Sequence, residues 1–251
     1  MKSKSQKEIQ EYLDKMKNIQ SFLLDFLNAE QSHDQHFFIF NKYINDHKIK
    51  INKNEIKAIL HLICNISNNH YRTPNFFIKI ERVILIFKEE ILTKFSNSEI
   101  FKIFKSNKRI LLFLMENKFL KPDASIAKII SEKKYQRRHY PEYFLPEFKV
   151  LVKTKMNENN EKFSQFEKKR KEGENDHYIC HLIRNDLVEE FISYVNKENL
   201  SLSLTTIKPS IFETNAYLLE KRPTLIEYSA FFGSIQIFRY LFFLKVELTS
   251  S

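Results

Sequence analysis

Two groups of histidine and cysteine have a spacing that a metal ion could use. His61 and Cys64 are three residues apart, and His177, Cys180 and His181 repeat that spacing. Residues three or four apart share one face of a helix, where imidazole and thiolate groups can bind zinc. Structural zinc sites usually contain closer pairs of cysteines, and the chain has only these two. We therefore expect both cysteines to be small core residues in a protein without a metal or other cofactor.

Glycine is nearly absent, and this limits the chemistry that the chain can perform. Only Gly173 and Gly233 occur in the whole sequence. Phosphate-binding loops and nucleophile elbows need several glycines, because the backbone must approach a ligand closely or adopt a positive φ angle. The sequence also shows no recognisable combination of nucleophile, base and oxyanion donor that would form another kind of catalytic site. The sequence therefore predicts a protein without catalytic residues, which is not an enzyme.

Basic residues are concentrated in the first 175 residues. This region contains 34 Lys and Arg against 22 Asp and Glu, whereas residues 176–251 contain seven against nine. A basic surface could meet an acidic partner such as nucleic acid, and the clearest basic cluster is Lys133–His139. The run Lys168–Lys171 is flanked by glutamates, which is typical of a solvated linker. A genome that favours Lys, Asn, Ile and Phe codons explains the same composition, so nucleic acid is the alternative partner.

Apolar residues recur at three- and four-residue steps along most of the chain, which predicts an all-α fold. The run from Ile9 to Leu27 predicts one amphipathic helix of about five turns. Ser96 and Glu99 have capping-box spacing, and Thr73-Pro74 is typical of an N-cap followed by proline. No segment shows the strict alternation of a half-buried strand. We expect a helical solenoid built from helix–turn–helix pairs.

A polar and highly charged segment, residues 156–176, predicts a boundary near residue 175. We therefore expect a helical N-terminal region of unknown function, 1–175, and a second region, 176–251. The longest apolar run, Ser234–Leu244, includes an arginine and is too short to cross a membrane. No secretory signal is visible, and two distant cysteines fit a reducing compartment. The expected location is the cytoplasm, with the nucleus as a second option.

The segment Thr224–Gly233, with the sequence TLIEYSAFFG, resembles the ankyrin consensus T-P-L-H-x-A-A-x-x-G. The resemblance implies a pair of antiparallel helices, in which the small residues Ser229 and Ala230 let the helices approach closely. Gly233 would supply the left-handed turn between them without a steric cost. The second helix would then begin near Ile235.

Upstream, Cys180–Val195 resembles an earlier and more degenerate repeat, with Asp186 at the position of the turn glycine. The two turns are farther apart than one repeat of about 33 residues, so the extra residues lie within Leu200–Leu219. Together with the leader FSNSEIFKIFKSNKRILLFLMENK, this order resembles the trichomonad-type ankyrin-repeat proteins of protozoa. In that family a helical region precedes an array of more repeats, so the chain resembles a short or truncated member.

This resemblance implies a non-enzymatic scaffold that binds another protein, whose identity the sequence leaves open. Ankyrin arrays bind partners with their first helices and the loop tips between repeats, which implies Tyr228, Phe231 and Phe232 as partner-binding residues. Packing against the preceding repeat or against the segment 200–219 is an equally good interpretation of these three residues. An array normally ends in a repeat with a polar outer face. The last helix is instead rich in phenylalanine and leucine, which predicts weak self-association.

Overall fold

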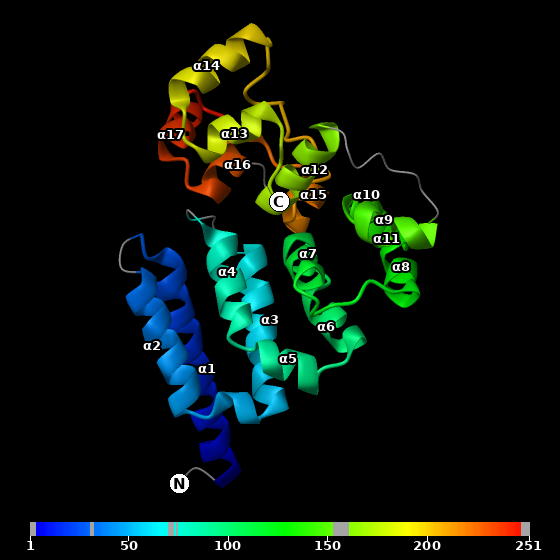
Figure 1. Cartoon of the computed structure of the whole chain (residues 1–251). Coiled ribbons are helices and arrows are strands. Elements are labelled where there is room, and N and C mark those ends of the chain that lie inside the picture. Colours follow the sequence, from blue (N-terminus) through cyan, green and yellow to red (C-terminus); the bar gives the residue numbers. More distant parts are fainter. Residues whose placement is uncertain (1–3, 31–32, 70–72, 74, 153–160, 247–251) are drawn as a thin grey trace. The chain divides into compact units, whose positions relative to one another are not determined.

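The computed structural model describes residues 4–30, 33–69, 73, 75–152 and 161–246 (Figure 1). Within these residues every regular element is a helix, and the only extended pairing is one isolated antiparallel bridge between Thr206 and Thr224. The predicted all-α fold class is therefore confirmed for the described part of the chain.

The chain forms two compact units. Residues 1–105 and 113–120 make up unit 1, and residues 106–112 and 121–251 make up unit 2. In chain order the described helices are α1 (Lys4–Asn28), α2 (His33–Asp46), the 3₁₀ helix η1 (Ile49–Ile51), α3 (Lys53–Asn69), α4 (Phe76–Leu85), α5 (Lys88–Lys94), α6 (Asn97–Phe104), α7 (Lys108–Glu116), α8 (Ala124–Ile130), α9 (Lys133–Gln136), α10 (Tyr140–Tyr143), α11 (Leu145–Val152), α12 (Glu161–Glu172), α13 (Tyr178–Arg184), α14 (Val188–Lys197), α15 (Ala216–Lys221), α16 (Leu225–Phe232) and α17 (Ile235–Phe243).

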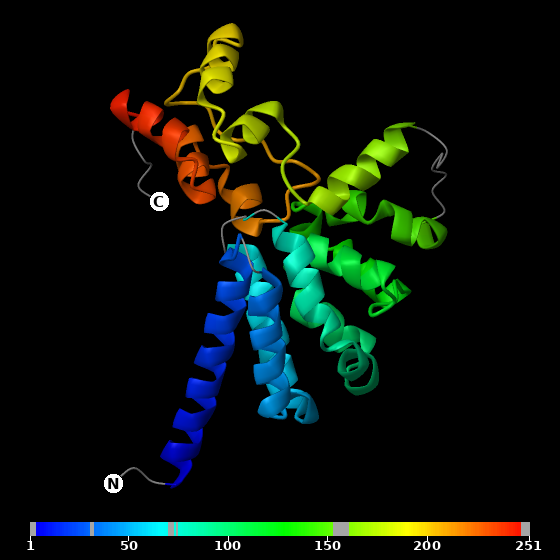
Figure 2. The same cartoon turned by 60° about the vertical axis from the view of Figure 1, so that its left-hand side comes forward.

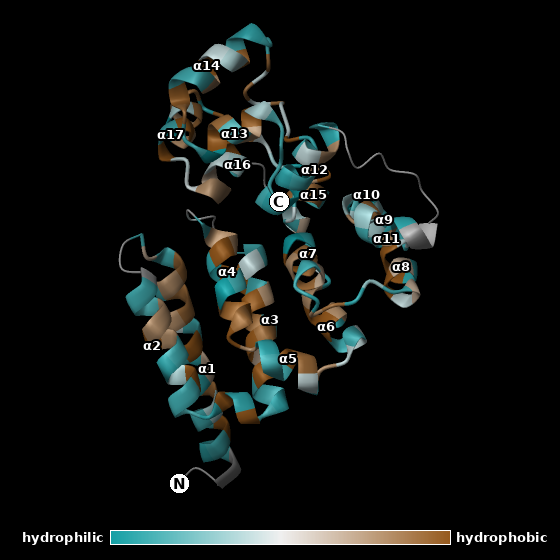
Figure 3. Cartoon of the chain, viewed as in Figure 1, coloured by the Kyte–Doolittle hydropathy of each residue, from teal (hydrophilic) through white to brown (hydrophobic). Residues whose placement is uncertain are grey.

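The first amphipathic helix forms as predicted. α1 packs along α2 and buries the side chains of Ile19, Leu23 and Phe26, which are spaced by three and four residues. Polar and apolar residues are mixed along both helices (Figure 3), as expected when only one side faces a core. The N-terminal part of α1 runs on beyond the end of α2 (Figure 2), and Ile9 and Leu13 on it are exposed.

The predicted helix starts of unit 1 are confirmed at α6 and wrong at α4. The Ser96 hydroxyl accepts the N–H of Glu99, whose carboxylate accepts the N–H of Ser96, so the capping box is complete. α4, however, begins at Phe76 with Asn75 as its N-cap. The Thr73 hydroxyl instead donates to the carbonyl of Leu27. It does so because the last carbonyls of α1 have no partners within their own helix.

A buried arginine organises part of unit 2. Arg170 on α12 donates to both carboxylate oxygens of Glu147 on α11, at 2.8 and 2.7 Å, and to the carbonyl of Tyr143. Its side chain is only 1% exposed. The interpretation of Lys168–Lys171 as a solvated run is therefore wrong at this residue. A bidentate pair lets a guanidinium be buried because its charge is compensated and both terminal nitrogens have acceptors.

The two compact units do not divide near residue 175, where composition and charge change. Thr214 donates its hydroxyl to the carbonyl of Gly173 at 2.9 Å, and Asn175 donates its amide to the carbonyl of Lys208 at 2.8 Å. Both bonds join the segment before that position to the one after it. Residues 121–175 therefore pack in unit 2 together with 176–251.

Candidate functional site

Unit 2 contains two helix hairpins of similar construction, α13/α14 and α16/α17. The turn of each hairpin has one residue in the left-handed conformation, Asp186 with φ 52° and Gly233 with φ 68°. The next residue in each case donates its N–H to the carbonyl five positions earlier, at 3.0 Å. The two turns therefore match, and Gly233 and Asp186 occupy the same backbone position, as the sequence predicts.

The second helices of the two hairpins also end in the same way. Asn199 after α14 and Lys245 after α17 are both left-handed, with φ 49° and 58°. Leu200 then donates its N–H to the carbonyl of Val195, and the residue after Lys245 makes the same bond to Leu241. Lysine stands where glycine would carry no strain, and its left-handed conformation costs roughly 1–2 kcal/mol. Packing of the hairpin therefore determines this turn, because the local preference of lysine opposes it.

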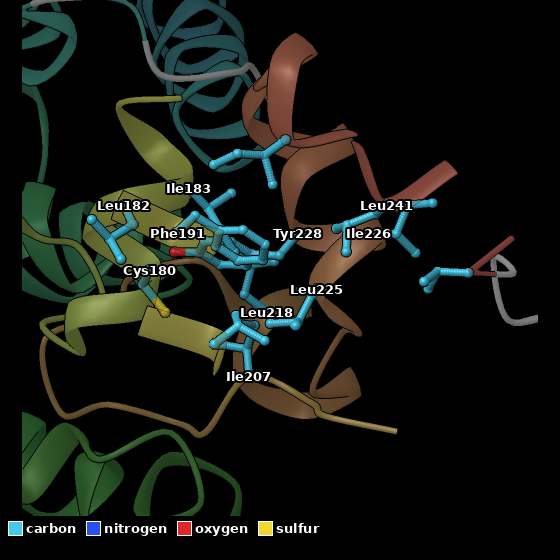
Figure 4. Packing of buried hydrophobic residues seen from close by; sticks show 13 residues of the cluster. Cys180, Leu182, Ile183, Phe191, Ile207, Leu218, Leu225, Ile226, Tyr228 and Leu241 are labelled. Atoms are coloured by element: carbon cyan, nitrogen blue, oxygen red, sulfur yellow. The ribbon is translucent and has the colours of Figure 1, made fainter. Parts of the chain in front are cut away.

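The hairpins stack through one apolar cluster (Figure 4). α13 contacts α16 and α14 contacts α17, so equivalent helices lie side by side. Residues of both hairpins meet in this cluster, among them Cys180, Phe191 and Leu241. Burial raises the pKa of the Cys180 thiol to about 12, so it stays protonated. The prediction that this cysteine is a small core residue is confirmed.

A carboxylate of the first hairpin caps the second. Asp186 accepts hydrogen bonds from the backbone N–H groups of Gln236 and Ile237, both at 2.9 Å. These groups lie in the first turn of α17, where backbone donors have no partner within the helix. The Ser234 hydroxyl also donates to the carbonyl of Ile183. Register between the hairpins is therefore set by polar bonds as well as by apolar packing.

The three predicted partner-binding residues lie in different environments. Tyr228 is fully buried, and its hydroxyl accepts a hydrogen bond from Arg184 of the first hairpin at 3.1 Å. Burial raises the pKa of this phenol well above its usual value. Phe231 and Phe232 are half-buried, with ring centres 5.0 Å apart. Tyr228 therefore belongs to the packing between the hairpins, while the two phenylalanines retain some exposed surface.

The small residues of α16 do not both serve helix packing. Ser229 is buried and donates to the carbonyl of Ile226, but Ala230 is exposed. Ala230 and Gly233 line a shallow, mainly apolar hollow of about 320 Å³. No heavy atom lies within 4 Å of the position that a Cβ on Gly233 would occupy. The expectation that Ala230 lets the two helices approach closely is therefore wrong, because this residue faces open space.

An apolar stripe on α17 continues from this hollow. Ile235 and Phe238 line the hollow, and Phe242 stacks on Phe238 with ring centres 6.2 Å apart. The three-and-four spacing puts all three on one face of the helix. Ile235 is 60% and Phe242 62% exposed, and the neighbouring Phe243 is 78% exposed. The outer face of α17 thus presents an unusual amount of apolar surface to solvent.

The first hairpin shows how unusual this face is. The matching turns after α14 and α17 pair the buried residues Phe191 and Val195 with Ile237 and Leu241. With this alignment the three stripe residues correspond to Glu189, Ile192 and Asn196 of α14. Glu189 and Asn196 are polar and exposed, as is usual on a helix surface. α17 has isoleucine and phenylalanine at the same two positions. The sequence contained this signal, since the last helix already stood out as apolar.

The basic clusters are partly neutralised. Arg138 pairs with Glu220 at 2.6 Å, and Lys134 lies 3.6 Å from Glu132. Lys133 and Arg137 are exposed on or next to the short helix α9. The cluster Lys133–His139 therefore presents a mixed surface, in which two cations have carboxylate neighbours and Lys133 and Arg137 are exposed.

One lysine of unit 2, Lys108, is fully buried, which its sequence pattern does not predict. The Lys108 ammonium, at the start of α7, donates to the carbonyls of Arg138 at 2.9 Å and Ile211 at 2.7 Å. Burial lowers its pKa to about 7, against the opposing effects of Glu213 and Glu142. An amine with such a pKa can act as a base or nucleophile when it is accessible. Here it is enclosed and joins three chain segments, and its only sequence signal is its place before an apolar run.

The two His and Cys spacings that a metal ion could use form no metal site in the described residues. Cys64 is buried and His61 is exposed, although they lie on the same helix. His181 is exposed and its ring contacts Asn185 at 3.2 Å. No group of three or more His, Cys, Asp or Glu in the described part of the chain is arranged to hold an ion.

None of the helices that the structure describes is long and apolar enough to cross a bilayer. No family model, curated protein or solved structure matches the chain. The two hairpins and the exposed face of α17 are therefore the features from which a function can be inferred.

Proposed function

We propose that this chain is a non-enzymatic scaffold for protein–protein interaction, in which the two hairpins are degenerate ankyrin-type repeats. The observation that carries the proposal is the exposed stripe Ile235, Phe238 and Phe242 beside the hollow at Gly233. Monomeric proteins rarely expose contiguous apolar patches of this kind unless another molecule covers them. Burying one such side chain under a partner would contribute roughly 1.5–3 kcal/mol to the free energy of binding. The stripe is therefore a strong candidate for a docking surface.

The repeat interpretation rests on the matched turns and on the order of the helices. Both hairpins have a left-handed residue in the turn, a second left-handed residue after the second helix, and equivalent helices side by side. Ankyrin-type stacking uses the same elements. The bridge between Thr206 and Thr224 closes the long connection between the hairpins. Phe231 and Phe232 on α16 remain proposed secondary contacts of the partner.

Nucleic-acid binding through the basic N-terminal region remains the alternative function. It is less well supported, because Arg138 and Lys134 are engaged with carboxylates. The two functions differ in their response to salt. Contacts to phosphates weaken steeply as salt rises, since bound counterions are released on association. Apolar contacts depend much less on salt.

The test compares three forms of the immobilised chain in a lysate of the source cells, washed at low and at high salt. The first is the wild type, and the second carries Ile235→Asp and Phe242→Asp. The third is a matched control with Phe38→Asp and Ile78→Asp, two unit 1 residues that are 65% and 62% exposed. We expect the wild type and the control to retain the same proteins at high salt, and the α17 variant to lose them.

Two other results would contradict the proposal. If nucleic acid is the only captured material and high salt removes it, the basic-surface function is correct. If all three forms retain the same proteins equally, a partner binds elsewhere and the α17 face is not the docking surface. Circular dichroism of each form before the experiment ensures that a loss of capture does not reflect unfolding.

A further inference from the structure

The outer face of α17 has the dimensions of a binding surface for one helix. From Ile235 to Phe242 the stripe covers about two helical turns, or roughly 10 Å. The hollow at its N-terminal end, about 320 Å³ in volume, has room for one or two large apolar side chains. Within the same unit, α14 already packs side by side with α17, with the rings of Phe191 and Tyr240 6.4 Å apart. The positions of α14 that correspond to the stripe, Glu189 and Asn196, are exposed, so the stripe is not a repeat of this contact. Its fit to a helix rests on its length and on the hollow at its end.

The charge beside the stripe indicates what that helix carries. Arg239 lines the hollow and is exposed, and the described residues offer it no hydrogen bond or ion pair. Lys245 is also exposed, just beyond the end of α17. No acidic residue occurs between Glu227 and Lys245 in the sequence. An acidic side chain next to the apolar residues of a bound helix would therefore meet an unpaired guanidinium.

The turn at Gly233 makes the outer face of α17 different from the contact between the two hairpins. In that contact Asp186 caps the N-terminus of α17 with its carboxylate. Gly233 occupies the same backbone position and has no side chain to offer. A hairpin docked in the same way would lose this cap, which is worth about 1 kcal/mol. The outer face of α17 therefore favours a helix that lies along the stripe over one whose N-terminus points at the Gly233 turn.

The charge also argues against a second copy of this chain pairing through the same face. In a two-fold symmetric pair, the residues at the centre of the stripe meet their own counterparts. Phe238 and Arg239 are at that centre, so two guanidinium groups would be brought together. Juxtaposed like charges oppose such an interface. A different chain with a negative charge at this position has no such cost.

We infer that the α17 face binds a single amphipathic helix of a partner protein, with apolar residues at three- and four-residue spacing and a flanking acidic residue that pairs with Arg239. This inference rests on the proposed function and names the class of partner that the site accepts. Helix-in-groove recognition of this kind depends on a few apolar anchors, and a charge at the rim selects among partners.

The experiment selects ligands from a displayed library of 18-residue helical peptides with fixed apolar positions and random polar ones. The target is the full chain, and binding of the selected peptides is then measured by fluorescence anisotropy. We expect Asp or Glu to be enriched on one flank of the apolar stripe. Ile235→Asp with Phe242→Asp should weaken binding at least tenfold, and the control Phe38→Asp with Ile78→Asp should leave it unchanged.

A charge exchange tests the pairing itself. Arg239→Glu should weaken binding of the acidic peptides about tenfold, and a peptide with Lys at the enriched position should regain it. Arg239 is exposed, so the variant is expected to fold. Equal binding of acidic and basic peptides to the wild type would overturn the inference. So would a wild-type chain that sediments as a dimer while the Ile235→Asp, Phe242→Asp variant is a monomer, because the occupant is then a second copy.

The two levels of the proposal fail separately. If no helical peptide is selected while the lysate experiment still shows proteins lost from the α17 variant, the scaffold function stands and the helical partner is wrong. If the α17 variant captures the same proteins as the wild type and binds the peptides equally, both are wrong.

Discussion

The carboxylate of Asp186 accepts the backbone N–H of Ile237 at 2.9 Å, so the turn of one hairpin caps a helix of the next. The same residue holds a left-handed conformation, with φ 52°. Aspartate is one of the few side chains that can do both, because its short polar side chain tolerates positive φ and accepts two N–H groups. This one residue therefore links the turn of the first hairpin to the start of α17 in the second.

Substitution at this position should separate the two roles. Asp186→Gly relieves any backbone strain but removes the cap, and we expect a loss of about 1 kcal/mol in the free energy of unfolding. Asp186→Ala loses the cap and adds left-handed strain, so it should cost about 1–2 kcal/mol more. Asp186→Asn, the conservative control, should be close to the wild type. Urea denaturation measures all three, and an Asp186→Ala variant as stable as Asp186→Gly would contradict the account.

Lys108 should make the stability of unit 2 depend on pH. Burial lowers its pKa from the usual 10.5 to about 7 in the folded protein, so the unfolded chain binds more protons between these limits. Stability therefore rises with pH across this window, by up to about 1.4 kcal/mol per pH unit. Below pH 7 the group is charged in both states and contributes no slope.

The comparison that isolates this lysine uses Lys108→Met, which keeps the length of the side chain without its charge. We expect the free energy of unfolding of the variant to rise less between pH 7 and 9 than that of the wild type. Lys128→Met, at an exposed position of α8, is the matched control and should keep the wild-type slope. Parallel pH profiles for all three proteins would show that Lys108 titrates normally.

The pair Arg170 and Glu147 predicts strong non-additivity. Arg170→Met leaves Glu147 without its bidentate partner in a largely buried place, and we expect a loss of about 3–5 kcal/mol. Arg170→Met combined with Glu147→Leu removes both charges of the pair and should recover part of that loss, because the contact of Arg170 with Glu167 at 3.2 Å is lost in both variants. Chemical denaturation of both single variants and the double variant completes the cycle. A double variant that loses the sum of the single effects would show that the pair is not coupled.

The carboxyl of Glu99 should titrate at unusually low pH. The hydrogen bond from Lys53 lowers its pKa most, and the Ser96 N–H adds to this, giving a value of about 2. Lys53→Met should move the pKa of Glu99 back toward its usual value of 4.5. Ser96→Ala should move it less, because this change removes only the hydroxyl and keeps the backbone N–H. Carboxyl chemical shifts followed by NMR from pH 1.5 to 6 measure both changes. A larger effect of Ser96→Ala would reverse the assigned order of causes.

Local sequence signals determined most of the helices. Three-and-four periodicity was sufficient for α1, and the box at Ser96 and Glu99 was sufficient for the start of α6, because both depend on residues within one or two turns. The turn at Gly233 was also readable, since a glycine after an apolar run favours a left-handed helix end. Whether the hairpins are ankyrin-type repeats stays a prediction, as do the partner and the function.

Contacts between distant residues decided the rest. Thr73 became a donor to Leu27 instead of an N-cap, Arg170 entered a core, and Lys108 was buried between two carbonyls, each through a partner far away in sequence. Tyr228 was readable as apolar and helical, but only packing against Arg184 decided that it faces inward. Periodicity and caps are local and survive in a single sequence. Burial depends on which side of a helix meets another, and only the tertiary structure fixes that choice.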